Sequence, residues 1–183
     1  MRRVAAALET GAGSLYVYVA GRDGLIGAMF DRIAAAIELE PPDPPRWRLQ
    51  VHALLERIRD ALVAHPGIAA ATMVSPPTSE TVLRVLENLF GILLAGGLDV
   101  QSAAWTADVL NGQVTYAAIE SELRRTDPDA LADEVAANFA RLPADEFPLI
   151  TAHTAELVAG DVDERFRFAI DAVLDGALAK ARG

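Results

Sequence analysis

Several features are missing from this 183-residue sequence, and each absence excludes a class of protein. There is no cysteine, which excludes disulfides, thiolate metal ligands and cysteine nucleophiles. No run of residues approaches the roughly 20 apolar positions that a membrane-spanning helix needs. The apolar stretch at the N-terminus is interrupted too early, at Glu9 and Thr10, for a signal peptide. We therefore expect a cytoplasmic protein without membrane contacts.

Histidine is also scarce, with only His52, His65 and His153. None of them belongs to a paired metal motif such as H-E-x-x-H, and the sequence has neither a nucleophile elbow nor a phosphate-binding loop. His153 and Glu156 share a helical face and could bind a metal, although a surface ion pair is the more common outcome. The sequence predicts no enzyme, no cofactor and no metal site.

Basic residues are outnumbered, because 16 Lys and Arg stand against 26 Asp and Glu, for a net charge of -10. This balance argues against a protein whose whole surface binds nucleic acid. The first 22 residues differ from the rest, since they contain Arg2, Arg3 and Arg22 against Glu9 alone. Such asymmetry suits a chain that touches DNA only with its N-terminal end.

Helical periodicity is what the sequence does contain. Apolar residues make up 52% of it and alanine is abundant, whereas period-two alternation and hairpin turns between apolar runs are absent. We therefore predict an all-α protein. The predicted helices cover residues 1–8, 14–19, 24–40, 47–64, 68–74, 79–95, 99–125, 149–159 and 162–181, with a further helix starting at Asp127 and Pro128.

Side-chain caps mark several of these helix starts. The predicted N-caps are Thr78 or Ser79, Asp99, Asp127 and Asp161. Asp161 is followed three residues later by Glu164, which is the spacing of a capping box.

The clearest break in the chain is Pro41–Pro45, with four prolines in five residues. Such a run cannot form a regular helix or a central strand. We interpret residues 41–46 as a linker between a headpiece, residues 1–40, and a body, residues 47–183.

The headpiece pattern is a helix, a tight turn and a second short helix, which is the arrangement of a helix-turn-helix motif. It reads RRVAAALETGAGSLYVYVAGRDGLIGAMFD. The stretch Ser14–Val19, followed by Arg22 and Asp23, resembles the recognition helix of the TetR family of transcriptional regulators, and the body resembles the TetR regulatory domain. The resemblance implies a small DNA-binding headpiece, a helical ligand-binding and dimerisation domain, and a ligand-responsive homodimeric regulator, expected to be a repressor.

The resemblance also implies which headpiece residues contact operator DNA: Arg2, Ala12, Gly13, Ser14, Tyr16, Val17, Tyr18 and Arg22. Tyr16 is expected to bind a phosphate through its hydroxyl, while Leu15 and Val19 pack inward on Val4, Ala7 and Leu8. The small and apolar residues suit contacts with thymine methyl groups. Each residue alone could be a half-buried aromatic or a solvated charge, and it is the order of the whole string that favours DNA.

Two departures from the family pattern affect this prediction. Glu9 stands where the family usually has glycine, which puts a negative charge near DNA and demands a strained backbone. The family's first helix has no counterpart before Met1, so we expect weak or no operator binding by this chain, and an upstream start codon that makes Met1 an internal methionine. The alternative function is a helical ligand-binding or interaction dimer that no longer binds DNA.

In the body, the resemblance implies a pocket for a small hydrophobic effector among the helices from Trp47 to Tyr116. Its candidate lining residues, each of which could also be plain core or surface, are His52, Met73, Phe90, Leu94, Trp105, Asn111, Gln113 and Tyr116. Tetracycline-binding relatives hold magnesium with a histidine in the stretch that matches residues 68–73. No histidine is present there, so a tetracycline–magnesium ligand is not expected.

The last predicted helix carries an apolar stripe at helical spacing. Its members are Phe166, Ile170, Val173, Ala177 and Leu178. In the family, this helix and the long one around residues 103–123 pair with their copies in a four-helix interface, and we predict that the stripe forms it. The alternative is that the stripe covers the protomer's own core.

Overall fold

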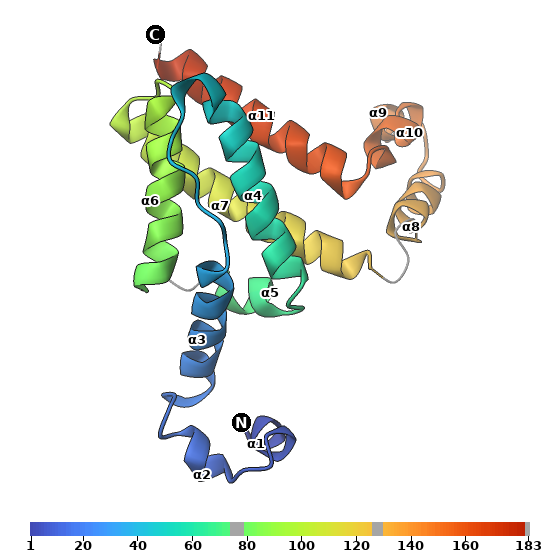
Figure 1. Cartoon of the computed structure of the whole chain (residues 1–183). Coiled ribbons are helices and arrows are strands. Elements are labelled where there is room, and N and C mark those ends of the chain that lie inside the picture. Colours follow the sequence, from blue (N-terminus) through green and yellow to red (C-terminus); the bar gives the residue numbers. More distant parts are fainter. Residues whose placement is uncertain (74–78, 126–129, 182–183) are drawn as a thin grey trace.

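The computed structural model describes residues 1–73, 79–125 and 130–181. All regular structure in these ranges is helical, which confirms the all-α prediction (Figure 1). The elements are α1 (Arg2–Ala7), α2 (Ala12–Leu15), α3 (Gly21–Ala35), the 3-10 helix η1 (Pro44–Arg46), α4 (Trp47–Val63), α5 (Ile68–Thr72), α6 (Glu80–Ala95), α7 (Val100–Leu123), α8 (Ala130–Phe139), α9 (Pro148–Ala152), α10 (Thr154–Val158) and α11 (Val162–Ala181).

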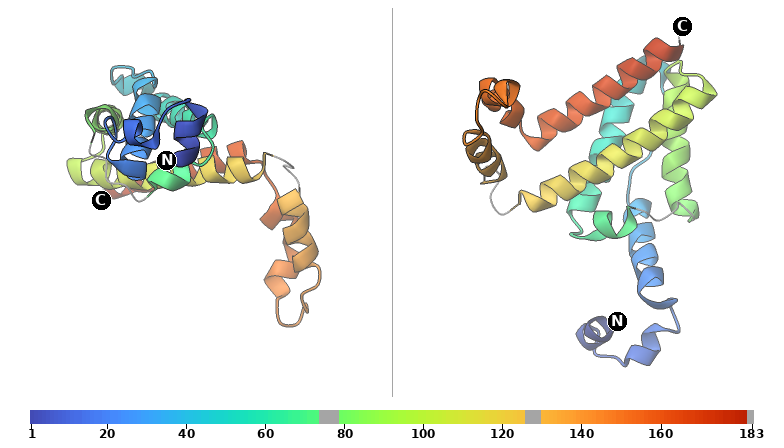
Figure 2. Two further views of the ribbon diagram at one scale, coloured as in Figure 1. Left: turned by 90° about the horizontal axis from the view of Figure 1, so that it is seen from below. Right: turned by 180° about the vertical axis from the view of Figure 1, so that it is seen from behind.

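The body consists of two layers of helices (Figure 2). Helices α4 and α6 form one layer, and α7 and α11 lie side by side in the other. Leu54 of α4, Leu110 and Val114 of α7, and Phe166 and Ile170 of α11 are almost completely buried between the layers. Because burial of each such side chain contributes about 1.5–3 kcal/mol, this core holds the body together.

The predicted caps of α6 and α7 are confirmed. The Ser79 hydroxyl accepts a hydrogen bond from the Val82 amide at 3.2 Å. Asp99 accepts hydrogen bonds from the amides of Gln101 and Ser102, each at 3.0 Å. These bonds satisfy amides that have no partner within the first turn of a helix, and so define where the two helices begin.

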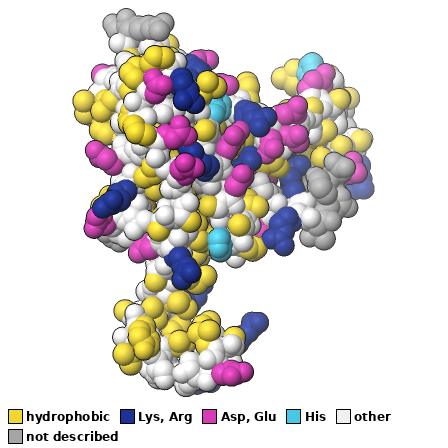
Figure 3. Space-filling view, viewed as in Figure 1, with side chains coloured by type: hydrophobic (Ala, Val, Ile, Leu, Met, Phe, Trp, Pro, Cys, Tyr) yellow, Lys and Arg dark blue, Asp and Glu magenta, His cyan; other side chains and the backbone are white. Residues whose placement is uncertain are grey.

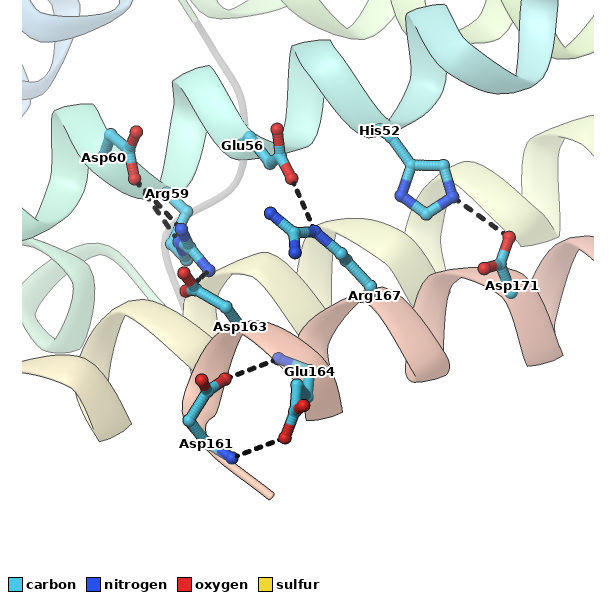
Figure 4. A network of polar contacts seen from close by, with 9 residues as sticks. All are labelled: His52, Glu56, Arg59, Asp60, Asp161, Asp163, Glu164, Arg167 and Asp171. Carbon is cyan, nitrogen blue, oxygen red and sulfur yellow. Dashed lines mark hydrogen bonds and ion pairs between the residues drawn. The ribbon is translucent and has the colours of Figure 1, made fainter. Parts of the chain in front are cut away.

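The predicted capping box at the start of α11 is also confirmed. The Glu164 amide donates to the Asp161 carboxylate at 2.8 Å, and the Asp161 amide donates to the Glu164 carboxylate at 3.1 Å (Figure 4). The predicted caps Thr78 and Asp127 lie outside the described residues.

The segment that joins α3 to α4 is bound to the body at successive positions. The helix predicted over residues 24–40 already ends at Ala35, and the following backbone groups find partners on α4 and α6 instead. The Asn88 amide donates to the carbonyl of Glu40 at 2.8 Å. Gln50, which is buried, donates to the carbonyl of Pro41 at 2.8 Å and accepts from the amide of Asp43 at 2.7 Å.

Two other boundaries differ from the sequence-based expectation. Pro44 lies at the first position of η1, although the proline run was predicted to be non-helical; proline is tolerated there because that position needs no amide donor. The helix predicted over residues 149–159 is divided at His153, whose φ of −122° is not helical. Helices α8, α9 and α10 project from the body (Figure 2).

The contact between α6 and α4 generates a testable prediction. A Cβ atom added at Gly96 would overlap the indole ring of Trp47. We expect Gly96→Ala to lower the free energy of unfolding by about 1–3 kcal/mol, because the ring must move out of its packed position. Urea unfolding followed by circular dichroism measures this.

Gly27→Ala is the matched control for this experiment. Gly27 lies inside α3 and an added Cβ would meet open space, so the better helix propensity of alanine should leave stability unchanged or raise it, by up to about 1 kcal/mol. Equal unfolding midpoints for the two variants would contradict the proposed contact.

Candidate nucleic-acid interface and ligand cavity

The candidate nucleic-acid interface lies at the end of the molecule formed by α1 and α2, farthest from α11 (Figure 1). A tight turn joins the two helices, and the Thr10 amide closes it on the carbonyl of Ala5 at 3.0 Å. Glu9 has a φ of 52°, which confirms the strained backbone predicted where the family usually has glycine.

The predicted recognition helix is shorter than residues 14–19 and begins earlier. Helix α2 ends at Leu15, and the chain continues as a tight turn. The amides of Tyr18 and Val19 both donate to the carbonyl of Leu15, at 3.0 and 3.1 Å. The short rod is therefore preserved, but Ser14 lies inside the helix rather than at its first residue.

The two faces of this rod differ as predicted. Leu15 and Val19 are half-buried on the inner side. The side chains of Tyr16, Val17 and Tyr18 are 58%, 79% and 84% exposed. Aromatic and apolar side chains are thus held in solvent, where burial against another molecule would be favourable.

The remaining predicted contacts also lie on the headpiece surface. Arg2, Gly13 and Ser14 are exposed, and the Arg22 side chain is 75% exposed. Ala12 begins α2, and its side chain lies outside the described part of the structure. Figure 3 shows the contrast with the body, whose surface on this side carries many interspersed acidic and basic side chains.

One packing prediction for the headpiece is corrected for Ala7 and Leu8, whereas Val4 is half-buried. Leu15 and Val19 were expected to pack on Val4, Ala7 and Leu8, but Ala7 is exposed and Leu8 is 62% exposed. The buried residue of α1 is Ala5, so the helix turns a different face inward.

A cavity of about 540 Å³ lies between the headpiece and the body. Helix α3 supplies one wall, and α4, α5, α6 and α7 supply the others. Most of the wall is apolar and includes Phe30, Leu55, Ile58, Leu62, Leu86 and Leu89. Asp31 of α3 and Asp108, Asn111 and Thr115 of α7 are among its polar residues. The volume and the mixture of side chains are typical of a small-molecule site.

Two of the eight predicted ligand contacts, Met73 and Asn111, line this cavity. The other six, His52, Phe90, Leu94, Trp105, Gln113 and Tyr116, lie outside it, and the prediction is corrected for them. Trp105 and Tyr116 are exposed on another face of α7, because each residue of a helix turns about 100° from the last.

Sequence reasoning missed α3 as a wall of the cavity. Ile26, Phe30 and Ile33 line the cavity, but they belong to the helix predicted over residues 24–40, for which no cavity was expected. No signal in this stretch separates a cavity wall from an ordinary packed face, because charged residues flank the apolar stripe of most surface helices.

His52, a predicted ligand contact, instead belongs to a polar seam between α4 and α11 (Figure 4). His52 Nε2 lies 3.0 Å from Asp171 Oδ1, and Arg48 donates to the same oxygen at 3.0 Å. Further along the seam, Arg59 donates to Asp163 at 2.7 Å and Arg167 donates to Glu56 at 3.1 Å. The hydrogen bond from His52, followed by that from Arg48, lowers the pKa of Asp171 against the opposing effect of desolvation.

The predicted dimer stripe is corrected for Phe166 and Ile170. These side chains are 1% and 0% exposed and lie in the protomer's own core, so they cannot reach a partner. Val173, Ala177 and Leu178 are half-buried against the same core.

A different apolar face is exposed on α7 and α11. Trp105, Val109 and Tyr116 of α7 are 64%, 52% and 59% exposed, and Phe168 of α11 is 75% exposed. Both helices lie on the same side of the body in Figure 2.

Residues 1–73, 79–125 and 130–181 contain no group of three or more acidic or histidine side chains arranged to hold a metal ion. Within these ranges, the helices are too short or too polar to cross a membrane.

Comparison with known proteins identifies relatives along most of the chain. Residues 40–181 match the tetracyclin repressor-like, C-terminal domain. An HTH-type transcriptional regulator of Saccharopolyspora erythraea is 30% identical over 151 residues, which are 79% of this chain and 63% of that protein. The HTH-type transcriptional repressor DrrR1 of Streptomyces coeruleorubidus is 26% identical over 187 residues, which are 96% of this chain and 68% of DrrR1.

Solved structures agree with these relatives. The Streptomyces coelicolor TetR family protein ActR, in complex with actinorhodin, has a TM-score of 0.88 and 31% identity, over 99% of this chain and 87% of ActR. A helical body with a short helix-turn-helix end is the architecture of HTH-type regulators. Because the domain match covers most of its length, the chain belongs to the TetR family.

The seam between α4 and α11 generates a prediction about pH. A lowered pKa in the folded state means that Asp171 stabilises the fold above its unfolded pKa of about 4, and that this stability is lost as the pH falls through the folded pKa. We expect Asp171→Asn to reduce stability at pH 7 by no more than about 1 kcal/mol, because the carboxylate is partly exposed.

Urea unfolding at pH 7 and pH 3 measures the effect, and the difference from the unmodified chain should shrink at pH 3. Asp145→Asn, which changes an exposed carboxylate between α8 and α9, is the control and should have no effect at either pH. A difference that is the same at both pH values would contradict an ionic role for Asp171.

Proposed function

We propose that this protein is a ligand-responsive, DNA-binding transcriptional regulator, and that it acts as a repressor. The observation that carries the proposal is the two-faced rod at α2, which holds Tyr16, Val17 and Tyr18 in solvent while Leu15 and Val19 turn inward. Family membership and the names of the relatives, a transcriptional regulator and a transcriptional repressor, support it.

In the proposed complex, the outer face of α2 enters the major groove of operator DNA. The Tyr16 hydroxyl, Arg2 and Arg22 bind phosphates, and these contacts set the position of the headpiece on the duplex. Val17 and Tyr18 contact base edges, where apolar side chains favour thymine methyl groups. The remaining proposed contacts are Ala12, Gly13 and Ser14.

We propose the domain organisation that the sequence predicts: a headpiece over residues 1–40, a linker over 41–46 and a regulatory body over 47–183. The cavity links the proposed headpiece to the proposed body, because its walls come from both sides of the linker. A ligand that fills it presses against α3 and the body together, and so changes the tilt of the headpiece.

The protein is proposed to act as a homodimer through the exposed apolar face of α7 and α11. Trp105, Val109, Tyr116 and Phe168 would otherwise remain in water. Two recognition helices related by a two-fold axis would read half-sites about 34–36 Å apart, a distance that a change of tilt disturbs.

The DNA-binding proposal is tested by selecting genomic fragments with the purified chain in low-salt buffer, where phosphate contacts are strongest, and measuring mobility shifts. We expect Tyr16→Phe and Arg22→Ala each to weaken binding about 5- to 30-fold, the equivalent of one lost charge-assisted hydrogen bond of about 1–2 kcal/mol.

Arg84→Ala is the control, since Arg84 is an exposed cation on α6 in the body and should leave the shift unchanged. If Tyr16→Phe and Arg22→Ala bind like the unmodified chain, the interface is wrong. Selection of no DNA, which the sequence also led us to expect, favours a helical dimer that binds ligand without DNA.

The dimer proposal predicts that Trp105→Glu and Tyr116→Glu convert the protein to monomers, because dimerisation of either variant would bury an unpaired charge in the interface. Light scattering after size-exclusion chromatography gives the mass. Val17→Glu introduces the same charge at a headpiece position that is more exposed, and this variant should remain dimeric. A dimer that survives both α7 substitutions would contradict this interface.

A further inference from the structure

The charged side chains that line the cavity are acidic. Asp31 of α3 and Asp108 of α7 line it, whereas none of its described lining residues is lysine, arginine or histidine. A third lining carboxylate, Asp23, is 95% exposed and lies 3.7 Å from Arg22, so that arginine offsets its charge. Asp31 is half-buried, and Asp108 is exposed at the edge of the wall. The described wall therefore carries negative charge without a compensating cation.

Neither principal carboxylate is neutralised by the protein. Among the described residues, Asp31 and Asp108 form no ion pair, although acidic side chains elsewhere on the body are paired with arginine, as Glu56 is with Arg167. Both carboxylates are left to interact with whatever enters the cavity.

Two of the hydroxyl groups of the wall increase this bias toward acceptors. Thr72 donates its hydroxyl proton to the carbonyl of Ile68 at 2.8 Å, and Thr115 donates to the carbonyl of Asn111 at 2.9 Å. Their oxygens still have lone pairs facing outward from these bonds. The cavity consequently offers hydrogen-bond acceptors in excess of donors.

We propose that the cavity binds an organic cation, with an apolar body against Phe30 and the aliphatic wall and a protonated amine or similar group near Asp31 and Asp108. This inference rests on the proposed ligand response and specifies the class of ligand. An anionic ligand would face like charges in a partly desolvated site, which costs free energy. A bare metal ion would find an apolar wall instead of the six or more oxygen ligands that calcium takes.

Two further features favour a cation. The ring of Phe30 can add a cation–π contact to the carboxylate attraction. The net charge of -10 also raises the local concentration of cations around the chain.

The test compares two dyes that differ in one group. Rhodamine 6G is an ethyl ester with a net positive charge, and rhodamine 19 is the corresponding free acid, whose carboxylate cancels that charge. Fluorescence anisotropy during titration with the full chain gives both dissociation constants. We expect the ester to bind at least about tenfold more tightly than the acid, the effect of one charged contact.

Variants identify the origin of the preference. Asp31→Asn combined with Asp108→Asn should bring the two dissociation constants within about threefold of each other, and Asp108→Lys should make the acid the tighter ligand. Asp145→Asn removes one negative charge at a position far along the chain from the cavity, and this variant should still bind the ester more tightly than the acid. Circular dichroism of each variant checks that its helical content is unchanged.

Equal binding of the two dyes, tighter binding of the acid, absence of binding by the ester, or a preference that persists in the double variant overturns the inference. These outcomes are read from the dyes alone, without DNA. Failure of the mobility-shift experiment counts against the proposed regulator and leaves the charge preference of the cavity to be judged from the dyes.

Discussion

An apolar contact between α3 and the body fixes the position of the headpiece. Ile33 of α3 is buried in a small cluster with Leu62, Ile68, Ala69 and Ala118, which come from α4, α5 and α7. This cluster is separate from the main core between the two layers. Because interiors pack tightly, a displacement of α3 requires the cluster to rearrange. The cavity lies next to the cluster and shares Ile33 and Leu62 with it.

The connection between headpiece and body is otherwise restrained. Gln50 and Asn88 bind the segment between α3 and α4, so that segment does not act as a free hinge along its whole length. The seam between α4 and α11 joins the two layers through hydrogen bonds, of which those of His52, Arg59 and Arg167 are drawn in Figure 4. Arg48 adds bonds to Asp171 and Asp175. A movement of α3 requires the small cluster around Ile33 to repack, whereas a rearrangement within the body would break this seam.

Local features of the fold were predictable from the sequence. The caps at Ser79, Asp99 and Asp161 involve partners only two or three residues away, so the relevant physics lies within a short window. The left-handed backbone at Glu9 was predictable for the same reason, through comparison with a glycine in the family pattern.

The roles of helix faces were not predictable in the same way. The stripe containing Phe166 and the exposed side chain of Trp105 are both apolar at helical spacing, and a single sequence does not reveal which face meets the protomer's core. As a result, the exposed Trp105 was assigned to the ligand pocket and the buried Phe166 to the dimer interface. The cavity wall on α3 was missed because it forms only when helices distant in the sequence pack together.

The sharing of α3 has a thermodynamic consequence under the proposed function. If a ligand in the cavity lowers the affinity for operator DNA by some factor, operator DNA must lower the affinity for the ligand by the same factor. This holds because the two binding equilibria form a closed cycle. Protein already seated on an operator would then respond only at higher ligand concentrations than protein free in the cell, and the number of operator copies would shift the dose at which the gene responds.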